Sequence, residues 1–250
     1  MKVIFNGELL EDAQAPCSAT GWLNGTGIFE TIKTVNGAPY SLNRHIIRAQ
    51  KSAQELEIII PESAKIKEAV ANLLLSTPQV NGLLRISFSS QGGWLAAHLP
   101  YVVSTRELAV RIHAQPLAAD AHKKFPYTSR LEIQSQAHDA GFDDAITINA
   151  AGNICEGSVS NLLVKIDNQW LTPPVSDGVL PGIMRAILVE SNKVQVQSIA
   201  LSQVSKISSA FFLSSLRIAQ EISSIEANKL QPSHGFSEEI HALAQKYSID

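Results

Sequence analysis

The stretch AHKKFPYTSRLE, residues 121–132, holds the side chains best suited to covalent chemistry. Lys123 and Lys124 stand next to Phe125 and Pro126, so one of the two amines could lie in an apolar setting. A desolvated lysine loses its proton near neutral pH and can then attack a carbonyl. Paired lysines are more often solvated surface charges, and composition alone does not favour catalysis. The pair therefore raises the hypothesis of a carbonyl-binding amine.

Three further features could serve the same chemistry. Glu156 ends a predicted strand in NICEGSVSN, and Arg48 lies on a predicted early helix. The segment Leu180–Met184 predicts a helix start whose amides can bind a phosphate. An amine for a carbonyl, an acid for a ring nitrogen and a phosphate site are together what pyridoxal 5′-phosphate requires. Taken singly, the arginine, the acid and the helix start each have an ordinary structural explanation.

Other catalytic signatures are absent from the sequence. GTGIFE begins Gly25-x-Gly27 but has Glu30 where a dinucleotide-binding loop needs a third small residue. The sequence has no GK[ST] phosphate loop, GxSxG elbow or HExxH motif. The seven histidines form no metal-binding pair, so no metal is expected.

The elements that must position these residues follow from hydrophobic periodicity. Alternating patterns predict strands at KVIFNGEL, GIFETIKTV, LLRISFS, PYVVSTRE, AVRIHAQ, DAITINA, SNLLVKI, QWLTPP, QSIAL and AFFLSS. Helical spacing predicts helices over 42–57, 61–76 and about 128–140, from LPGIMRAILVES, and at SEEIHALAQKYS. Asn6-Gly7 and Asn36-Gly37 favour tight hairpin turns. We expect an N-terminal α+β domain over 1–115, a linker at 116–121 and a second domain over 122–250.

Composition restricts the class of protein. The 250 residues are 45% hydrophobic and 17% charged, which is typical of a globular protein with ample core. A net charge of −3, with no basic cluster longer than Lys-Lys, gives no indication of nucleic-acid binding. Cys17 and Cys155 lie far apart, and no apolar segment approaches a membrane span, so we expect a reduced, cytoplasmic protein.

In order and wording, these pieces resemble the class IV aminotransferase family, the fold-type IV pyridoxal-phosphate enzymes. GTGIFET followed by HIIR is similar to the family's opening, GFDDAITINAAGNICEGSVSNLLV to its central signature, LPGIMR to its phosphate-binding turn and AFFLSSLRIAQEI to its late strand and loop. The resemblance implies a two-domain α+β fold, with a smaller N-terminal α/β domain and a larger C-terminal β-barrel-like domain. It also implies pyridoxal 5′-phosphate, a small amino-bearing substrate and a homodimer.

The resemblance assigns roles to numbered residues. Arg48, the Ile183 and Met184 amides and the Ser215 hydroxyl would bind the cofactor phosphate, and Glu156 would face the ring nitrogen.

The lysine context departs from the family, in which Lys is usually followed by Thr or Ser. Matching TSR to the family would put Pro126 at the lysine position, whereas counting back without gaps from GFDDA selects Lys123. We adopt the ungapped register, in which Lys123 forms the Schiff base and Tyr127 lies one turn on, near the cofactor phenolate. Lys124 is the alternative, because neighbouring strand residues point to opposite faces.

Two stretches favour one branch of the family. FETIK and SSLR, at Ser214–Arg217, resemble the 4-amino-4-deoxychorismate lyases of folate biosynthesis, where NSLRG is frequent. Here Ser214 replaces the Asn and Ile218 replaces the Gly. This implies release of 4-aminobenzoate and pyruvate, with Arg85 and Arg217 as candidate ligands for substrate carboxylates, although either can be structural. An aminotransferase acting on D- or branched-chain amino acids is one alternative. A cofactor-free family member with a binding role is the other.

Overall fold

The computed structural model describes residues 1–118 and 120–249, which form two compact units. Unit 1 contains Met1–Val103, His122–Pro126 and the C-terminal residues from Tyr247; unit 2 contains Ser104–Ala121 and Tyr127–Lys246. Residue 119 of the predicted linker lies outside the described residues, and the predicted domain limits stay a prediction. Among the described helices, none combines the length and the apolar character needed to cross a membrane.

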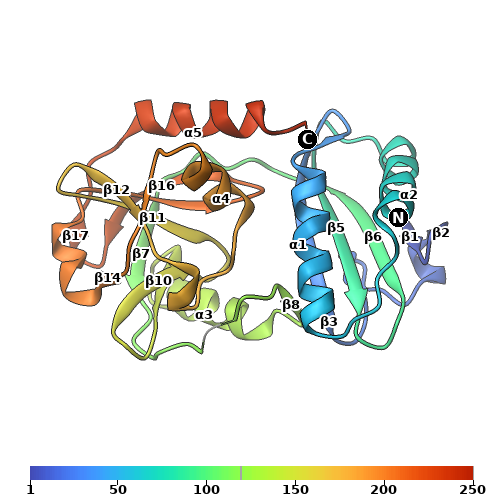
Figure 1. The fold of residues 1–250 in the computed structure, drawn as a ribbon, viewed down its shortest axis with the longest axis horizontal. Helices are drawn as coiled ribbons and strands as arrows, with labels where there is room; N and C mark the ends of the chain where they lie inside the picture. The colour runs from blue at the N-terminus through green and yellow to red at the C-terminus, as the bar shows by residue number, and fades with distance from the viewer. Residues whose placement is uncertain (119, 250) are drawn as a thin grey trace. The chain divides into compact units, whose positions relative to one another are not determined.

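Unit 1 is built on one sheet with the strand order β2-β1-β6-β5-β3-β4, and β8 pairs with β3 (Figure 1). The strands are β1 (Lys2–Phe5), β2 (Glu8–Glu11), β3 (Gly27–Val35), β4 (Ala38–Pro39), β5 (Asn81–Ser89), β6 (Trp94–Pro100) and β8 (Lys124–Phe125). Positive φ angles at Asn6, Gly7, Asn36 and Gly37 confirm the two predicted hairpin turns.

Two helices, α1 (Leu42–Glu55) and α2 (Ser63–Ser76), complete unit 1 and confirm the predicted helices. The apolar positions at helical spacing are buried against the sheet: Ile46, Ala49 and Ala53 on α1, and Ile66, Val70, Leu73 and Leu74 on α2. Burying each larger side chain contributes about 1.5–3 kcal/mol, so this face holds α1 firmly against β3.

Unit 2 contains the larger sheet, with the order β13-β12-β11-β15-β16-β7-β9-β10-β14. Because β10 also pairs with β11, the strands from β11 through β15, β16, β7 and β9 to β10 form a closed ring. The strands are β7 (Leu108–Ile112), β9 (Asp144–Ile148), β10 (Asn153–Gly157), β11 (Asn161–Ile166), β12 (Gln169–Thr172), β13 (Gln195–Val196), β14 (Ile199–Ala200), β15 (Ser209–Ser214), β16 (Ile218–Ile225) and β17 (Asn228–Lys229).

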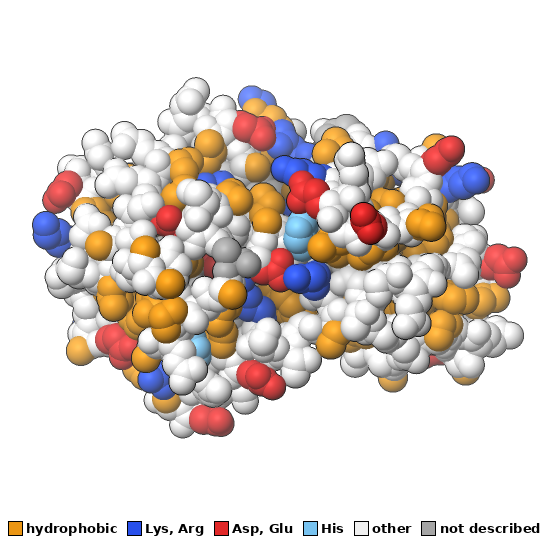
Figure 2. All heavy atoms as spheres, turned by 60° about the horizontal axis from the view of Figure 1, so that its bottom comes forward, with side chains coloured by type: hydrophobic (Ala, Val, Ile, Leu, Met, Phe, Trp, Pro, Cys, Tyr) orange, Lys and Arg blue, Asp and Glu red, His pale blue; other side chains and the backbone are white. Residues whose placement is uncertain are grey.

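Three helices pack on this sheet (Figure 1). They are α3 (Thr128–Asp139), α4 (Ile183–Glu190) and α5 (His234–Lys246), as the sequence predicted within a few residues. On the face drawn in Figure 2, acidic and basic side chains are interspersed, and the described residues there form no extended basic surface.

One predicted strand is wrong. The alternation in PYVVSTRE, 100–107, predicts a strand, but β6 ends at Pro100 and residues 101–107 are not part of a sheet. Val102 is 87% exposed, so its apolar character reflects no burial against a neighbouring strand. The paired strand lies just before it, at Trp94–Pro100, and was not predicted.

Candidate active site

A buried charge cluster in unit 1 consists of Glu30, His45 and Arg48; we call it the Glu30 cluster. Glu30 lies on β3 and is 3% exposed, while His45 and Arg48 are three residues apart on α1 and so share one helix face. His45 Nδ1 lies 2.6 Å from Glu30 Oε2, and Arg48 donates from Nε to Oε1 at 2.8 Å and from Nη2 to Oε2 at 2.5 Å. The carboxylate is thus bound by both helix residues.

Electrostatics fix the charge states in the Glu30 cluster. Burial raises the pKa of Glu30, but the cation Arg48 and the interaction with His45 outweigh it and bring the pKa to about 2. Burial lowers the pKa of His45 below its ordinary value, despite the opposing effect of Glu30. His45 is therefore neutral at pH 7 and donates its Nδ1 proton to Glu30. Its Nε2 atom is buried and has no hydrogen-bond partner among the described residues.

Lys123 and Lys124 belong to unit 1: Lys124 is the first residue of β8, and Lys123 directly precedes this strand. Lys124 pairs with Ile28 of β3 and is exposed, whereas Lys123 is partly buried and its carbonyl accepts the Phe29 N–H at 2.8 Å. Lys123 Nζ lies 4.5 Å from the centre of the Phe29 ring, and its charge is one of those that lower the pKa of His45. Lys123 therefore lies beside the Glu30 cluster.

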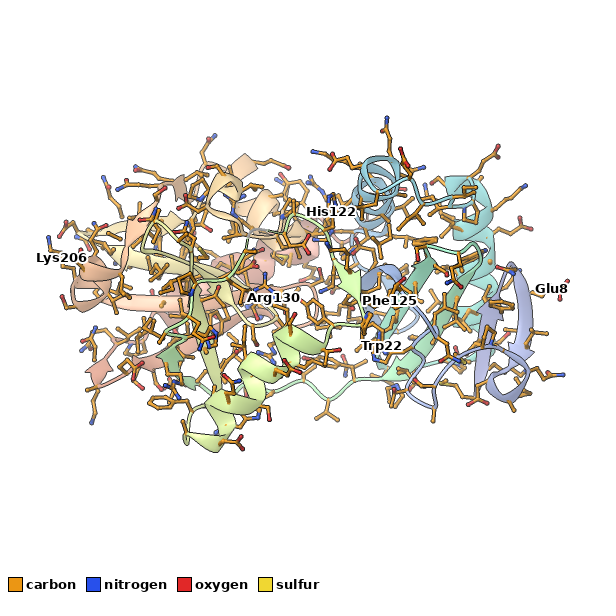
Figure 3. The ribbon with its side chains drawn as sticks, turned by 90° about the horizontal axis from the view of Figure 1, so that it is seen from below. Glu8, Trp22, His122, Phe125, Arg130 and Lys206 are labelled. Carbon is orange, nitrogen blue, oxygen red and sulfur yellow. The ribbon has the colours of Figure 1, made fainter. Side chains whose placement is uncertain are left out.

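Gly27 on β3 allows the neighbouring strands β5 and β8 to lie close to β3. A Cβ atom on Gly27 would lie 2.0 Å from the carbonyl oxygen of Phe88 and 2.9 Å from the Phe125 ring. Phe125 packs beside Trp22, with ring centres 6.5 Å apart (Figure 3).

Arg85 has a different environment in unit 1. Its guanidinium stacks 3.8 Å above the Trp22 ring, and Nη1 donates to the Thr20 carbonyl at 2.6 Å. Burial lowers the pKa of Arg85 to about 10. These contacts hold Arg85 against the loop around Trp22.

In unit 2, Glu156 on β10 is 5% exposed and accepts hydrogen bonds from three directions. Oε2 accepts from Asn161 Nδ2 and from the Leu180 N–H, both at 3.0 Å, and Oε1 accepts from Arg130 Nη2 at 2.8 Å. A buried carboxylate needs such partners, because an unpaired one costs several kcal/mol. Glu156 is thus fixed in place by a strand, a loop and α3.

The start of α4 is joined to Glu156 through Asn161. Asn161 Nδ2 also donates to the Leu180 carbonyl at 2.9 Å, and Ile183 and Met184 are the first residues of α4. A Cβ atom on Gly182 would lie 1.8 Å from Asn161 Oδ1, so this position requires glycine. The first amides of a helix have no partner within the helix, which makes this end suited to an anion.

The Ser214–Ile218 turn follows β15. The Arg217 N–H donates to Ser214 Oγ at 3.1 Å, and Ser215 is partly buried. Ile218 has a φ angle of 65°, which is unfavourable for a β-branched side chain and is a conformation that glycine adopts readily. Burial raises the pKa of the neighbouring Asp144, and the charge of Arg217 partly opposes this rise.

The predicted site residues divide between the units. Unit 1 holds Arg48, Lys123 and Arg85, of which the first two lie around His45. Unit 2 holds Tyr127, Glu156, Ile183, Met184, Ser215 and Arg217. Tyr127 directly precedes α3 and is partly buried.

Four residues that contact the predicted site residues were not predicted from the sequence: Glu30, His45, Arg130 and Asn161. Signals for them were present in FET, in HIIR, in TSR and in SVSN, but each matters through a hydrogen bond that joins two different elements of the fold.

Comparison with known proteins identifies the class. The model of the family "Amino-transferase class IV" matches residues 27–225, and the chain belongs to this family. The fold-type IV pyridoxal-phosphate enzyme fold predicted from the sequence, with an N-terminal α/β sheet and a C-terminal β-barrel domain, is confirmed by solved structures.

Individual relatives are distant and differ in activity. The chain is 28% identical to the "Putative branched-chain-amino-acid aminotransferase" of Methanocaldococcus jannaschii, over 77% of this chain and 75% of that protein. It is 24% identical to the aminodeoxychorismate lyase of Bacillus subtilis, over 76% and 73%. The solved PLP-bound form of a hypothetical aminotransferase from Mycobacterium tuberculosis has a TM-score of 0.84 at 20% identity, covering 100% of this chain and 99% of that one. The family model establishes the family, and these relatives leave the reaction open.

Proposed function

We propose that this chain binds pyridoxal 5′-phosphate through Lys123 and acts as a lyase on 4-amino-4-deoxychorismate, releasing 4-aminobenzoate and pyruvate. The observation that carries the cofactor proposal is Glu156, a buried carboxylate oriented by three donors. A carboxylate built in this way is suited to a ring nitrogen that must keep its proton.

Two groups of donors are each suited by their own chemistry to the phosphate end of the cofactor. Arg48 is held by Glu30, and the Ile183 and Met184 amides lie at the start of α4. The buried Nε2 of His45, which lacks a hydrogen-bond partner in the described part of the chain, adds a polar atom on the same helix face as Arg48 that a phosphate oxygen could engage once the imidazole is protonated. We infer that these residues, with the Ser215 hydroxyl, bind the phosphate.

The remaining roles follow from the chemistry of the residues. Bound pyridoxal phosphate supplies an electron sink for a carbanion at the carbon that bears the substrate amino group. Glu156 holds the proton on the ring nitrogen, and Tyr127 is the proposed neighbour of the ring oxygen. The Lys123 amine removes the proton from the substrate carbon as general base. Arg217 and Arg85 are the proposed ligands for the substrate carboxylates.

The choice of a lyase rests on the SSLR turn and on the similarity to the Bacillus subtilis lyase. Loss of the proton from the amino-bearing ring carbon, followed by cleavage of the bond between the adjacent ring carbon and the enol-ether oxygen, makes the ring aromatic. The group that leaves is enolpyruvate, which takes up a proton to become pyruvate. The gain in aromaticity drives this release.

The first experiment locates the lysine. Purified protein is loaded with pyridoxal phosphate, reduced with borohydride and mapped by mass spectrometry, with Lys123→Ala and Lys124→Ala alongside. We expect the pyridoxyl group on Lys123, its loss in Lys123→Ala and its retention in Lys124→Ala. Labelling of Lys124 would overturn the register, and no labelled lysine would favour the cofactor-free alternative.

The second experiment tests the reaction. Loaded protein is given 4-amino-4-deoxychorismate and pyruvate release is measured, with Lys123→Ala as the inactive control. A loaded protein that releases no pyruvate would exclude the lyase proposal while leaving the cofactor proposal intact.

An aminotransferase acting on branched-chain amino acids is the second candidate. It is favoured by the similarity to the Methanocaldococcus jannaschii protein, which is slightly higher than that to the lyase. Transfer of the amino group from leucine or valine to a 2-oxoacid, in the absence of pyruvate release, would establish it instead.

A further inference from the structure

The two terminal nitrogens of Arg130 differ in their hydrogen bonding within the described residues: Nη2 has a partner and Nη1 has none. It lies in the first turn of α3 (Figure 3), its side chain is only 11% exposed, and its Nη2 donates to Glu156 Oε1 at 2.8 Å. The other group, Nη1, is buried and has no hydrogen-bond partner among the described residues.

An unsatisfied donor of this kind is costly. Leaving a buried polar group without a partner costs about 1–3 kcal/mol, and more when the group is charged. Buried polar groups are therefore nearly always satisfied, and an exception calls for a missing partner. The bond from Nη2 to Glu156 restricts the position of the guanidinium, so Nη1, which shares the same carbon atom, also lies near the carboxylate.

We infer that Arg130 is a positioning residue that holds Glu156 through Nη2 and donates Nη1 to an anionic oxygen of the bound cofactor or substrate. This inference rests on the proposed function, because Glu156 must face the cofactor ring. A planar guanidinium is suited to binding two anionic oxygens side by side. Here Glu156 provides one of them and the ligand the other.

Two oxygens share the required chemistry. One is the phenolic oxygen of the cofactor ring, and the other is a carboxylate of the amino-bearing substrate. The two sources differ in when the bond forms, because the first is present on loading with cofactor alone and the second only when substrate binds.

The experiment uses the full chain and two variants of Arg130. Arg130→Met removes both donors, whereas Arg130→Lys keeps the positive charge but cannot serve both oxygens. Glu132→Gln, at an exposed position on the same helix, is the matched control. For each protein we measure circular dichroism, the Kd for pyridoxal phosphate and the visible absorption band of the loaded protein. We also measure KM and kcat for 4-amino-4-deoxychorismate.

The wild type and Glu132→Gln should agree in every measurement. If the oxygen belongs to the cofactor, both Arg130 variants bind pyridoxal phosphate about tenfold or more weakly and their absorption band shifts. If it belongs to the substrate, the Kd and the band are unchanged and KM rises about tenfold with little loss of kcat.

If Arg130→Met does not fold, Arg130→Lys alone tests the inference. Folded Arg130→Lys with the wild-type Kd, band and KM overturns the inference, since a water molecule then satisfies Nη1. Failure of the wild type itself to form a lysine adduct overturns the proposed function instead, so the two failures are distinguishable.

Discussion

Arg48 binds Glu30 through two hydrogen bonds, from Nε to Oε1 at 2.8 Å and from Nη2 to Oε2 at 2.5 Å. The pair joins α1 to β3 and fixes the plane of the guanidinium before a ligand binds. Side-chain ordering is part of the cost of binding, so a pre-positioned arginine binds phosphate more tightly than a mobile one.

Replacing Glu30 should therefore weaken phosphate binding at Arg48. We expect Glu30→Gln to raise the Kd for pyridoxal phosphate about tenfold, because the amide cannot hold the guanidinium with two charged bonds. Fluorescence titration measures this Kd. Glu68→Gln, at an exposed position on α2, should match the wild type. An unchanged Kd in Glu30→Gln would mean that Arg48 does not depend on the pair.

The Glu30 cluster also predicts how stability depends on pH. The pKa of Glu30 is lowered to about 2, so its stabilising effect is complete above its ordinary value of 4.5 and is lost as pH falls from 4.5 towards 2. The full effect corresponds to about 3 kcal/mol. The pKa of His45 is also lowered, so the unfolded chain takes up this proton first and stability falls as pH drops below 6.5.

Urea unfolding at a series of pH values tests both effects. Relative to wild type, Glu30→Gln should flatten the profile below pH 4.5, and His45→Gln should flatten it just below pH 6.5. Parallel profiles for all three proteins would contradict the assigned charge states.

His45 should change its protonation when a phosphate binds. In the unliganded protein it is neutral, facing Glu30 from β3, Arg48 from its own helix and Lys123 from the segment beside β8. A phosphate dianion next to Nε2 would raise the pKa of His45 and favour protonation of Nε2. Nitrogen NMR on histidine-labelled protein at pH 7 should detect one protonated ring nitrogen before pyridoxal phosphate is added and two afterwards.

The NMR signal is assigned with His45→Gln, in which it disappears. A signal that stays that of a neutral imidazole in loaded protein would exclude His45 from the phosphate site.

The sequence predicted residues that belong to local motifs and missed those defined by distant contacts. Arg48 and Glu156 stand within recognisable stretches. By contrast, the Arg48–Glu30 pair spans two elements of unit 1, and Arg130 meets Glu156 only because α3 packs near β10. Residues 100–107 have the alternation of a strand, but periodicity cannot reveal whether a neighbouring strand is available for pairing.

A strand was missed for a related reason. β16 begins at Ile218, directly after a turn, and carries the polar residues Gln220, Glu221, Ser223 and Ser224. It is a strand because β15 and β7 pair with it on either side. Its tertiary neighbours, and not its composition, determine its structure.

The cysteines should not act as nucleophiles. Burial, followed by the nearby Asp177 and Glu156 carboxylates, raises the pKa of Cys155 to about 12, and burial also raises the pKa of Cys17. We expect Cys155 to react with a thiol reagent at pH 8 only after denaturation, while the partly exposed Cys17 reacts slowly in the folded protein. Cys17→Ser assigns the two reactions. Rapid labelling of Cys155 in the native protein would contradict its burial.

Gly182→Ala tests the link between α4 and Glu156. The new methyl group would lie 1.8 Å from Asn161 Oδ1, so Asn161 must move and weaken its hydrogen bond to Glu156. We expect a loss of about 1–3 kcal/mol of stability, because overpacking a tight site costs this much, together with weaker pyridoxal-phosphate binding. Urea unfolding and the cofactor titration measure the two effects.

Gly235→Ala is the matched control. Gly235 lies in α5, and a Cβ atom there has no neighbour within 4 Å. Alanine should stabilise the protein by up to about 1 kcal/mol, because it favours the helix over glycine, and should leave the Kd for pyridoxal phosphate unchanged. If Gly182→Ala behaved like Gly235→Ala in both measurements, Asn161 would not be the residue that joins the start of α4 to Glu156.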